Sequence, residues 1–346
     1  MKKIIKNVLL SISIISSLNL GLISCSSEKE NEILNYSNFY VLGDSLSDIG
    51  AGTFGQNQYL ENSNNKFKHF QLDEPYYKNS WSNNKVASQL IAEKFNINFK
   101  PSWLFKLNDK IYQNYGNNYA FGGEVADSSN HNLVIKSFDL EHQTKALLSQ
   151  HKLQKKDLIW IEIGANDISS LMTKKNSIII DNKINNVLNQ EIKAINLLIA
   201  NGAKQIIISD VPDLTLTPKI KKILNNSQEK LKTASKICIK YQEAWKKMIL
   251  EMKEIYKKII TPFFLSKELL SDMTEFKKQM ANGIIETSAT YCKMIIKKES
   301  YSYKPVFNFG VNENNINKYF YFDEFHPGMW FHQQMANHII NILQNN

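Results

Sequence analysis

A serine and a histidine, in two short polar segments far apart in the chain, have the side chains needed for nucleophilic catalysis. Ser45 lies in GDSLSD at residues 43–48, directly after an apolar run. His326 lies in DEFHP at residues 323–327, three residues after Asp323. That spacing lets both side chains turn inward from one loop, so the carboxylate can bind one ring nitrogen while the other faces the serine. The alternatives are an ordinary turn or cap at Ser45 and a surface loop or partial metal site at His326.

Two further segments offer hydrogen-bond donors for a negatively charged oxygen. NYAFGG at residues 118–123 ends in paired glycines, whose N–H groups a substrate can approach closely. GAND at residues 164–167 follows a second apolar run, and Asn166 supplies a neutral amide donor. An ordinary Gly-Gly turn and an Asn-Asp cap are the alternatives for these two segments.

The elements that must position these residues are predicted from the apolar runs. Three runs are short, β-prone and bounded by polar residues, as is typical of buried parallel strands: 38–42, 157–163 and 205–209. A helical pattern over residues 185–200 joins the last two, so we expect a βαβ unit. Because ligands bind beyond the carboxyl ends of parallel strands, Ser45 and Asn166 are expected at one edge of the sheet.

The rest of the chain gives a less complete pattern. Helical spacing of apolar residues predicts helices over 81–96, 227–259 and 329–343. Residues 52–80 are predicted to form a long polar loop over the site. No element is assigned between residues 264 and 318.

The first residues have the form of an export signal. Lysines at positions 2, 3 and 6 precede an apolar stretch too short to cross a bilayer, so residues 1–24 are predicted to be a signal peptide. The ending LISC resembles the bacterial lipobox, which would make Cys25 the lipidated N-terminus. Residues 25–37 would then be a lipid-anchored tether, and residues 38–346 the folded domain on the outer side of the cell membrane. An ordinary signal peptide with an incidental Cys25 is the alternative.

Composition restricts the partners. The 42 basic residues outnumber the 33 acidic ones, and all 42 are lysine. Without arginine the chain lacks the usual means of bidentate phosphate or base recognition, so no nucleic-acid partner is expected. Excess lysine gives a weak attraction to anionic lipid. Two cysteines outside the leader, Cys238 and Cys292, are too few to predict a disulfide framework.

Taken together, the four segments resemble the SGNH/GDSL family of esterases and lipases, whose signature regions they match in the family's order. VPDL at residues 211–214 and the Tyr119-Ala120 pair are most similar to its phospholipase/lecithinase/hemolysin branch. Two positions depart from that branch. This chain has Gly328 where the branch usually has threonine, and Glu124 where a small residue is common.

The resemblance implies a role for each matched residue. Ser45 would be the nucleophile, His326 its general base and Asp323 the group that orients His326. The oxyanion hole would consist of three donors: the Ser45 N–H, a glycine N–H (Gly123 favoured, Gly122 possible) and the Asn166 side chain. No metal or cofactor would be needed.

The resemblance also implies an α/β fold, a three-layer α/β/α sandwich of flavodoxin-like type around a parallel sheet of about five strands. The implied function is a serine esterase or lipase acting on phospholipid or lysophospholipid acyl esters. A deacetylase of acetylated glycans and a lipid-anchored binding or adhesion protein are the alternatives. Four aromatic residues are expected to line an acyl-chain mouth: Tyr76, Tyr77, Trp103 and Phe105. The oligomeric state remains open.

Overall fold

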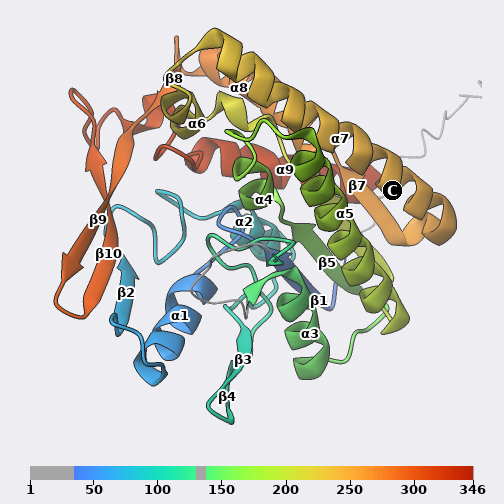
Figure 1. Ribbon diagram of the computed structural model, residues 1–346. Helices are drawn as coiled ribbons and strands as arrows, with labels where there is room; N and C mark the ends of the chain where they lie inside the picture. Colours follow the sequence, from blue (N-terminus) through green and yellow to red (C-terminus); the bar gives the residue numbers. More distant parts are fainter. Residues whose placement is uncertain (1–34, 130–137, 346) are drawn as a thin grey trace, which may run out of the picture. The chain divides into compact units, whose positions relative to one another are not determined.

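Four parallel strands form the central sheet (Figure 1). In the computed structural model, which describes residues 35–129 and 138–345, their order is β1-β5-β6-β7. Their bounds are β1 (Asn38–Gly43), β5 (Asp157–Glu162), β6 (Gln205–Ser209) and β7 (Ile260–Phe263). The three predicted strands are confirmed, and β7 is a fourth that the sequence did not predict. The expectation of about five strands is one too high for this sheet.

A fifth position beside β1 is occupied by an extended segment that is not a regular strand. It runs parallel to β1 and joins it through a single β-bridge between Val41 and Asn118. The Tyr119 N–H donates to the Val41 carbonyl at 2.8 Å, and the Phe121 N–H donates to the Gly43 carbonyl at 3.0 Å. This segment brings the glycine pair to the same edge of the sheet as Ser45.

Alternation along the strands divides the core into two layers. Tyr40 and Leu42 of β1 pack with helices on one face, whereas Phe39 and Val41 pack with helices on the other. The first face is covered by α3 (Leu140–Gln150), α5 (Ser177–Ala200) and α7 (Gln228–Tyr256). The second is covered by α2 (Ala87–Lys94), α8 (Leu265–Gln279) and α9 (Met329–Asn345). The fold is therefore the three-layer α/β/α sandwich that the sequence predicted.

The predicted helices are present, but some of them begin or end at other residues than the sequence predicted. The helix expected over 81–96 is only α2, because residues 81–86 form bends and irregular structure before it. The helix expected over 185–200 begins earlier, at Ser177, where Asn176 caps the first turn. The helices expected over 227–259 and 329–343 correspond to α7 and α9.

The prediction of a structureless loop over residues 52–80 is wrong. That segment contains α1 (Ala51–Asn62) and β2 (His69–Leu72). Helix α1 lacks an apolar stripe, but it packs closely at Gly55, where a Cβ would lie only 3.3 Å from ring atoms of Trp103 and of Phe121. Close packing at a glycine therefore compensates for the missing hydrophobic pattern.

The segment that the sequence left unassigned builds a second small sheet. Its strands β9 (Thr290–Lys297) and β10 (Ser300–Phe307) form a hairpin, and β10 pairs in parallel with β2. Figure 1 shows this sheet standing to one side of the sandwich.

The remaining strands are β3 (Trp103–Leu107), β4 (Lys110–Asn114), β8 (Ile284–Ser288) and β11 (Tyr319–Tyr321). The short helices are α4 (Ala165–Ser169), α6 (Pro218–Ile223), η2 (Leu214–Leu216), η3 (Lys257–Ile259) and η4 (Ile316–Lys318).

Among the helices that the structure describes, none has both the length and the hydropathy required to cross a bilayer. Cys25, the predicted signal peptide and most of the predicted tether lie outside the described residues.

Candidate active site

Ser45 lies in the turn that follows β1, close to the end of the neighbouring strand β5, whose Glu162 pairs with Gly43. The chain can turn there because residue 43 is glycine: a Cβ on Gly43 would lie only 2.5 Å from the Glu162 carbonyl oxygen. The Asp44 N–H donates to that same carbonyl at 3.2 Å, which fixes the start of the turn. Ser45 is thereby held at the carboxyl edge of the sheet, where α/β folds bind ligands.

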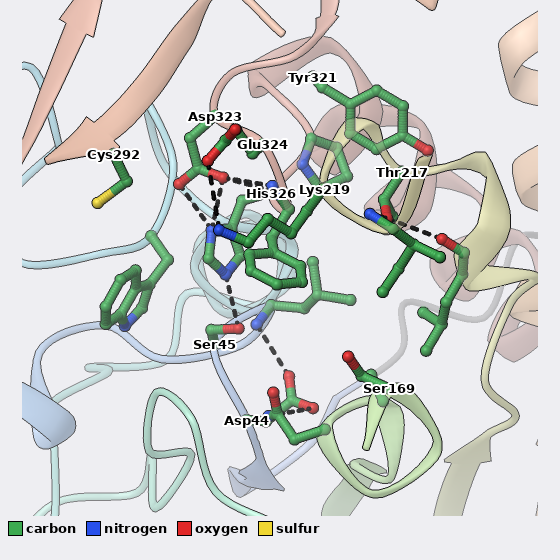
Figure 2. A pocket seen from close by; sticks show the side chains of 18 of the residues that line it. Asp44, Ser45, Ser169, Thr217, Lys219, Cys292, Tyr321, Asp323, Glu324 and His326 are labelled. Carbon is green, nitrogen blue, oxygen red and sulfur yellow. Dashed lines mark hydrogen bonds and ion pairs between the residues drawn. The ribbon is translucent and has the colours of Figure 1, made fainter. Parts of the chain in front are cut away.

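The loop between β11 and α9 brings His326 to Ser45. The His326 Nε2 lies 2.9 Å from the Ser45 Oγ, and its Nδ1 lies 2.7 Å from the Asp323 Oδ2. The Asp323 Oδ1 accepts the backbone N–H groups of Phe325 and His326, each at 2.8 Å. Figure 2 shows the three side chains in one hydrogen-bonded line. The structure thus brings together Ser45, His326 and Asp323, which lie up to 281 positions apart.

The Asp323 carboxylate is ionised in spite of its burial. Burial alone would raise the pKa of Asp323, but His326, the Tyr76 hydroxyl and a backbone N–H together hold the pKa below its ordinary value. An ionised acid at this place can fix the imidazole ring and stabilise the imidazolium form.

The two glycines of the NYAFGG segment have different surroundings. The Gly122 N–H donates to the Asp48 Oδ2 at 2.9 Å, and a Cβ on Gly122 would lie 2.0 Å from the Trp81 Nε1. Gly123 lines the cavity beside Ser45 and has a φ of +88°, which L side chains rarely adopt. Because the Gly122 N–H is bound to Asp48, Gly123 is the glycine whose position suits a donor to substrate.

Asn166, in α4 just after β5, also lines the cavity. Its Nδ2 donates to the Glu124 carbonyl at 2.8 Å and makes a longer contact of 3.5 Å with the Asp44 Oδ2. One N–H of the amide therefore orients the side chain. The other has only a weak partner, which a negatively charged substrate oxygen can replace.

A buried ion pair holds α4 against the segment that follows the glycine turn. Asp167 accepts the backbone N–H groups of Ala126 and Asp127 at 2.7 and 3.1 Å. Its Oδ1 lies 2.9 Å from the Lys183 Nζ, which also reaches Asp127. These bonds keep Asn166 and the glycine turn in fixed relation, a role for Asp167 that the sequence did not indicate beyond its place in GAND.

Two acids lie beneath the nucleophile turn. Burial raises the pKa of Asp44 to about 7, although the Leu46 N–H and the nearby His326 oppose the rise. Burial and the nearby Asp44 raise the pKa of Glu162 well above its ordinary value, although the Ser47 hydroxyl donates to it at 2.9 Å. These acids therefore carry little negative charge below neutral pH, which limits their repulsion of an oxyanion above them.

A cavity of about 400 Å³ opens in front of Ser45 and His326. Its lining includes buried apolar side chains from η2, α6, α8 and α9, which together we call the apolar arm: Leu214, Ile220, Leu265, Leu269 and Phe331. Lys219 and Glu324 also line the cavity and form an ion pair with an Nζ–Oε2 distance of 3.6 Å. The size and apolar character of the cavity are typical of sites for small, largely apolar ligands.

The prediction that four aromatic residues line the mouth of this cavity is wrong for three of them. Trp103 and Phe105 belong to a separate core cluster, and Tyr77 lines a different groove. Tyr76 does line the cavity, but its hydroxyl donates to Asp323 at 2.6 Å. The exposed apolar rim is formed instead by Met294 and Phe325, which are 53% and 41% exposed.

The sequence also contains residues that could bind a metal ion or form a disulfide. Within residues 35–129 and 138–345, no group of three or more His, Cys, Asp or Glu side chains is arranged to hold a metal ion. Cys238 and Cys292 are free thiols, so they do not pair with each other.

Comparison with known proteins agrees with this geometry. Residues 39–339 match the model of the GDSL-like lipase/acylhydrolase family. The chain belongs to this family. It is 27% identical over 263 residues to a GDSL esterase/lipase of Arabidopsis thaliana, covering 68% of each protein. It is 24% identical over 224 residues to a phosphatidylcholine-sterol acyltransferase of Aeromonas hydrophila, covering 63% of this chain and 56% of that protein.

The family assignment covers nearly all of the sandwich and the loop that carries Asp323 and His326. GDSL-like lipases/acylhydrolases act on esters, so membership of this family implies that the chain is a hydrolase of esters.

Proposed function

We propose that the chain is a serine-dependent carboxylic ester hydrolase whose substrates are phospholipid or lysophospholipid acyl esters. One observation carries the proposal: the 2.9 Å contact between the Ser45 Oγ and the His326 Nε2, at a cavity with an apolar arm. The contact supplies a nucleophile with a general base, and the arm supplies room for an acyl chain.

The proposed reaction proceeds through an acyl-serine. The Ser45 Oγ attacks the ester carbonyl carbon while its proton passes to the His326 Nε2, and the carbonyl π electrons move onto the oxygen. Collapse of this tetrahedral species breaks the bond to the alcohol, which leaves with the proton from His326. Water then attacks the acyl-serine with His326 again as base, releasing the carboxylic acid and restoring Ser45. Asp323 holds the imidazole in the required tautomer throughout.

Three neutral N–H donors would stabilise the oxyanion: the backbone of Ser45, the backbone of Gly123 and the Asn166 Nδ2. The positions of these residues support the assignment, because all three line the cavity at Ser45. Donors fixed before the reaction strengthen as charge develops and need no reorganisation.

The apolar arm favours a fatty-acyl substrate over a sugar. Each methylene that leaves water for the arm contributes about 0.8 kcal/mol. Leu265, Leu269 and Phe331 offer no hydrogen-bond partners to the hydroxyls of an acetylated glycan, although polar side chains such as Asp213 and Thr217 also line the cavity. Similarity to a phosphatidylcholine-sterol acyltransferase further supports a phospholipid as the acyl donor.

We also propose that Cys25 carries a lipid anchor and that the enzyme works at the outer surface of the cell membrane. The exposed Met294 and Phe325 at the rim of the cavity suit an ester presented by such a surface. Fractionation of cells carrying wild type or Cys25→Ala tests the anchor. The variant should leave the membrane fraction, and equal sedimentation of the two proteins would refute the anchor while leaving the catalytic proposal intact.

The decisive experiment compares wild type with Ser45→Ala on acetyl, octanoyl and palmitoyl esters, lysophosphatidylcholine, phosphatidylcholine and an acetylated glycan. We expect hydrolysis of the long-chain and phospholipid esters, and a loss of about 10⁴-fold or more in kcat for the folded variant. Substantial turnover by Ser45→Ala would refute the serine mechanism. Cleavage of the glycan alone would refute the substrate class, and cleavage of no ester would favour a binding or adhesion protein.

A further inference from the structure

Tyr76 extends the hydrogen-bonded line of Ser45, His326 and Asp323 by a fourth side chain. Its Oη lies 2.6 Å from the Asp323 Oδ2, the same oxygen that lies 2.7 Å from the His326 Nδ1. The tyrosine comes from the segment between β2 and α2, 247 positions away from Asp323. Both groups are buried, with Tyr76 3% and Asp323 2% exposed.

The direction of this hydrogen bond follows from the chemistry of its partners. Burial, and next the charge of Asp323, raise the pKa of the Tyr76 hydroxyl far above its ordinary value, so the hydroxyl keeps its proton. An ionised carboxylate can only accept. Tyr76 is therefore the donor, in an O–H···O⁻ bond of the short, charge-assisted kind.

The Tyr76 hydroxyl completes the set of donors around Asp323. One carboxylate oxygen accepts the backbone N–H groups of Phe325 and His326, and the other accepts the His326 ring and Tyr76. Four donors hold the carboxylate plane and leave it little freedom to rotate.

Two further titratable groups, Cys292 and Glu324, lie close to this hydrogen bond. The Cys292 Sγ lies 3.7 Å from the Tyr76 Oη, and burial raises the pKa of that thiol to about 11, so it is neutral. The Glu324 carboxylate is bound by Lys222 at 2.9 Å and by Lys219 at 3.6 Å.

The ring of Tyr76 is fixed by aromatic neighbours. It packs edge-on against Trp81 and Phe322, with ring centroids 5.5 and 5.3 Å apart. Trp81 in turn lies against the His326 ring, with the centroids 5.2 Å apart. Phenylalanine at position 76 would keep this packing and remove only the hydroxyl.

We infer that Tyr76 is a positioning residue of the reaction, whose hydroxyl keeps the Asp323 carboxylate ionised and turned toward His326. The inference rests on the proposed serine mechanism. A purely structural tyrosine would affect folding stability, whereas a positioning residue acts on the ionisation that catalysis requires.

Tyr76→Phe provides the test, with a soluble short-chain ester as substrate. We expect kcat/KM to fall roughly 10- to 100-fold with KM changed less than about twofold, as for loss of a hydrogen bond to a charged group. The acid limb of the kcat/KM–pH profile should move to higher pH, because a carboxylate without this donor protonates more readily. Tyr77→Phe, which alters a neighbouring tyrosine outside the cavity, should behave as wild type in both respects.

A double-mutant cycle with Asp323→Asn makes the inference stricter. Tyr76→Phe should have little further effect in the Asp323→Asn background, because its hydroxyl acts only through that carboxylate. An unchanged rate and pH profile in a folded variant, or full additivity with Asp323→Asn, would overturn the inference while the serine mechanism stands. Activity of Ser45→Ala would instead remove the mechanism itself.

Discussion

The Asp48 Oδ2 accepts the backbone N–H of Gly122 at 2.9 Å, and this bond joins the turn that carries Ser45 to the turn that carries Gly123. The same carboxylate accepts the Gly50 N–H at 2.7 Å at the start of α1. Asp48 thus holds three segments together: the nucleophile turn, the first turn of α1 and the glycine turn. Burial raises the pKa of Asp48 to about 6, although the N–H groups of Gly50, Gly122 and Gly52 oppose the rise.

Asp48→Asn should therefore reduce catalysis without preventing substrate binding. The amide can keep one oxygen toward Gly50 but presents an NH₂ group to the Gly122 N–H, so the glycine turn must move. We expect kcat for an ester to fall about 10²-fold with KM little changed, as for the loss of an oxyanion donor. Steady-state kinetics at pH 8 measure this. Asp109→Asn, at an exposed acid paired with Lys106, should match wild type. An unaltered kcat in Asp48→Asn would show that the glycine turn keeps its conformation without the bond to Asp48.

Gly123 and Gly310 allow a matched test of the glycine turn. Both have positive φ, +88° and +78°, and a Cβ on either would have no atom within 4 Å. Alanine at either position should thus cost a similar strain, about 1 kcal/mol of unfolding free energy. Only Gly123→Ala should lower kcat, because its methyl group lies in the cavity and its backbone is a proposed donor. Equal activities of the two variants, with equal losses of stability, would show that the backbone conformation and the free space at Gly123 do not limit turnover.

The residues proposed for catalysis were recognisable in the sequence because each lies in a short motif with its own local geometry. Ser45 and Asn166 directly follow strands, and Asp323 reaches His326 within one loop. Such short-range relations can be read from residue types and spacing. The contact between Tyr76 and Asp323 cannot, since it spans 247 positions and begins in an irregular loop.

The elements that were missed lack the pattern on which prediction relies. Strand β7 is four residues long and contains Pro262, which cannot donate to a ladder and is tolerated here because β7 is an edge strand. Helix α1 has no apolar stripe and depends on Asp48 and on glycine packing. Trp103 and Phe105 were assigned to the cavity mouth but lie in a core with Phe121 and Phe138. An aromatic residue in a loop or hairpin has the same sequence signature in either place.

Leu269 and Leu270 are neighbours in α8, but only Leu269 belongs to the apolar arm. Leu269 is 4% exposed and lines the cavity, whereas its neighbour Leu270 is 54% exposed. Leu269→Phe should fill part of the arm, so the ratio of kcat/KM for palmitoyl to acetyl esters should fall about tenfold or more. Overpacking should also cost about 1–3 kcal/mol of unfolding free energy. Leu270→Phe should leave the ratio unchanged, and an unchanged ratio in Leu269→Phe would place the acyl chain elsewhere.

His332, on α9, should make the fold sensitive to acid. It is fully buried, and its Nδ1 accepts the Ala87 N–H at 3.3 Å. Burial, with a smaller contribution from His326, lowers the pKa of His332 from 6.5 to about 3. Above pH 6.5 the imidazole is neutral in both the folded and the unfolded chain. Below pH 6.5 the unfolded chain binds a proton that the folded chain does not, so unfolding becomes more favourable as pH falls toward 3.

At pH 5 this difference amounts to about 2 kcal/mol of unfolding free energy. His332→Asn keeps an acceptor for the Ala87 N–H but cannot take up a proton. The variant should be less stable than wild type at pH 8, because the smaller side chain leaves a cavity. Its further loss of stability between pH 8 and pH 5 should nevertheless be smaller than that of wild type by about 2 kcal/mol. Urea unfolding at the two pH values measures both losses, with the exposed His69→Asn as the control that keeps the wild-type dependence. Equal losses in wild type and His332→Asn would assign the acid sensitivity to other groups.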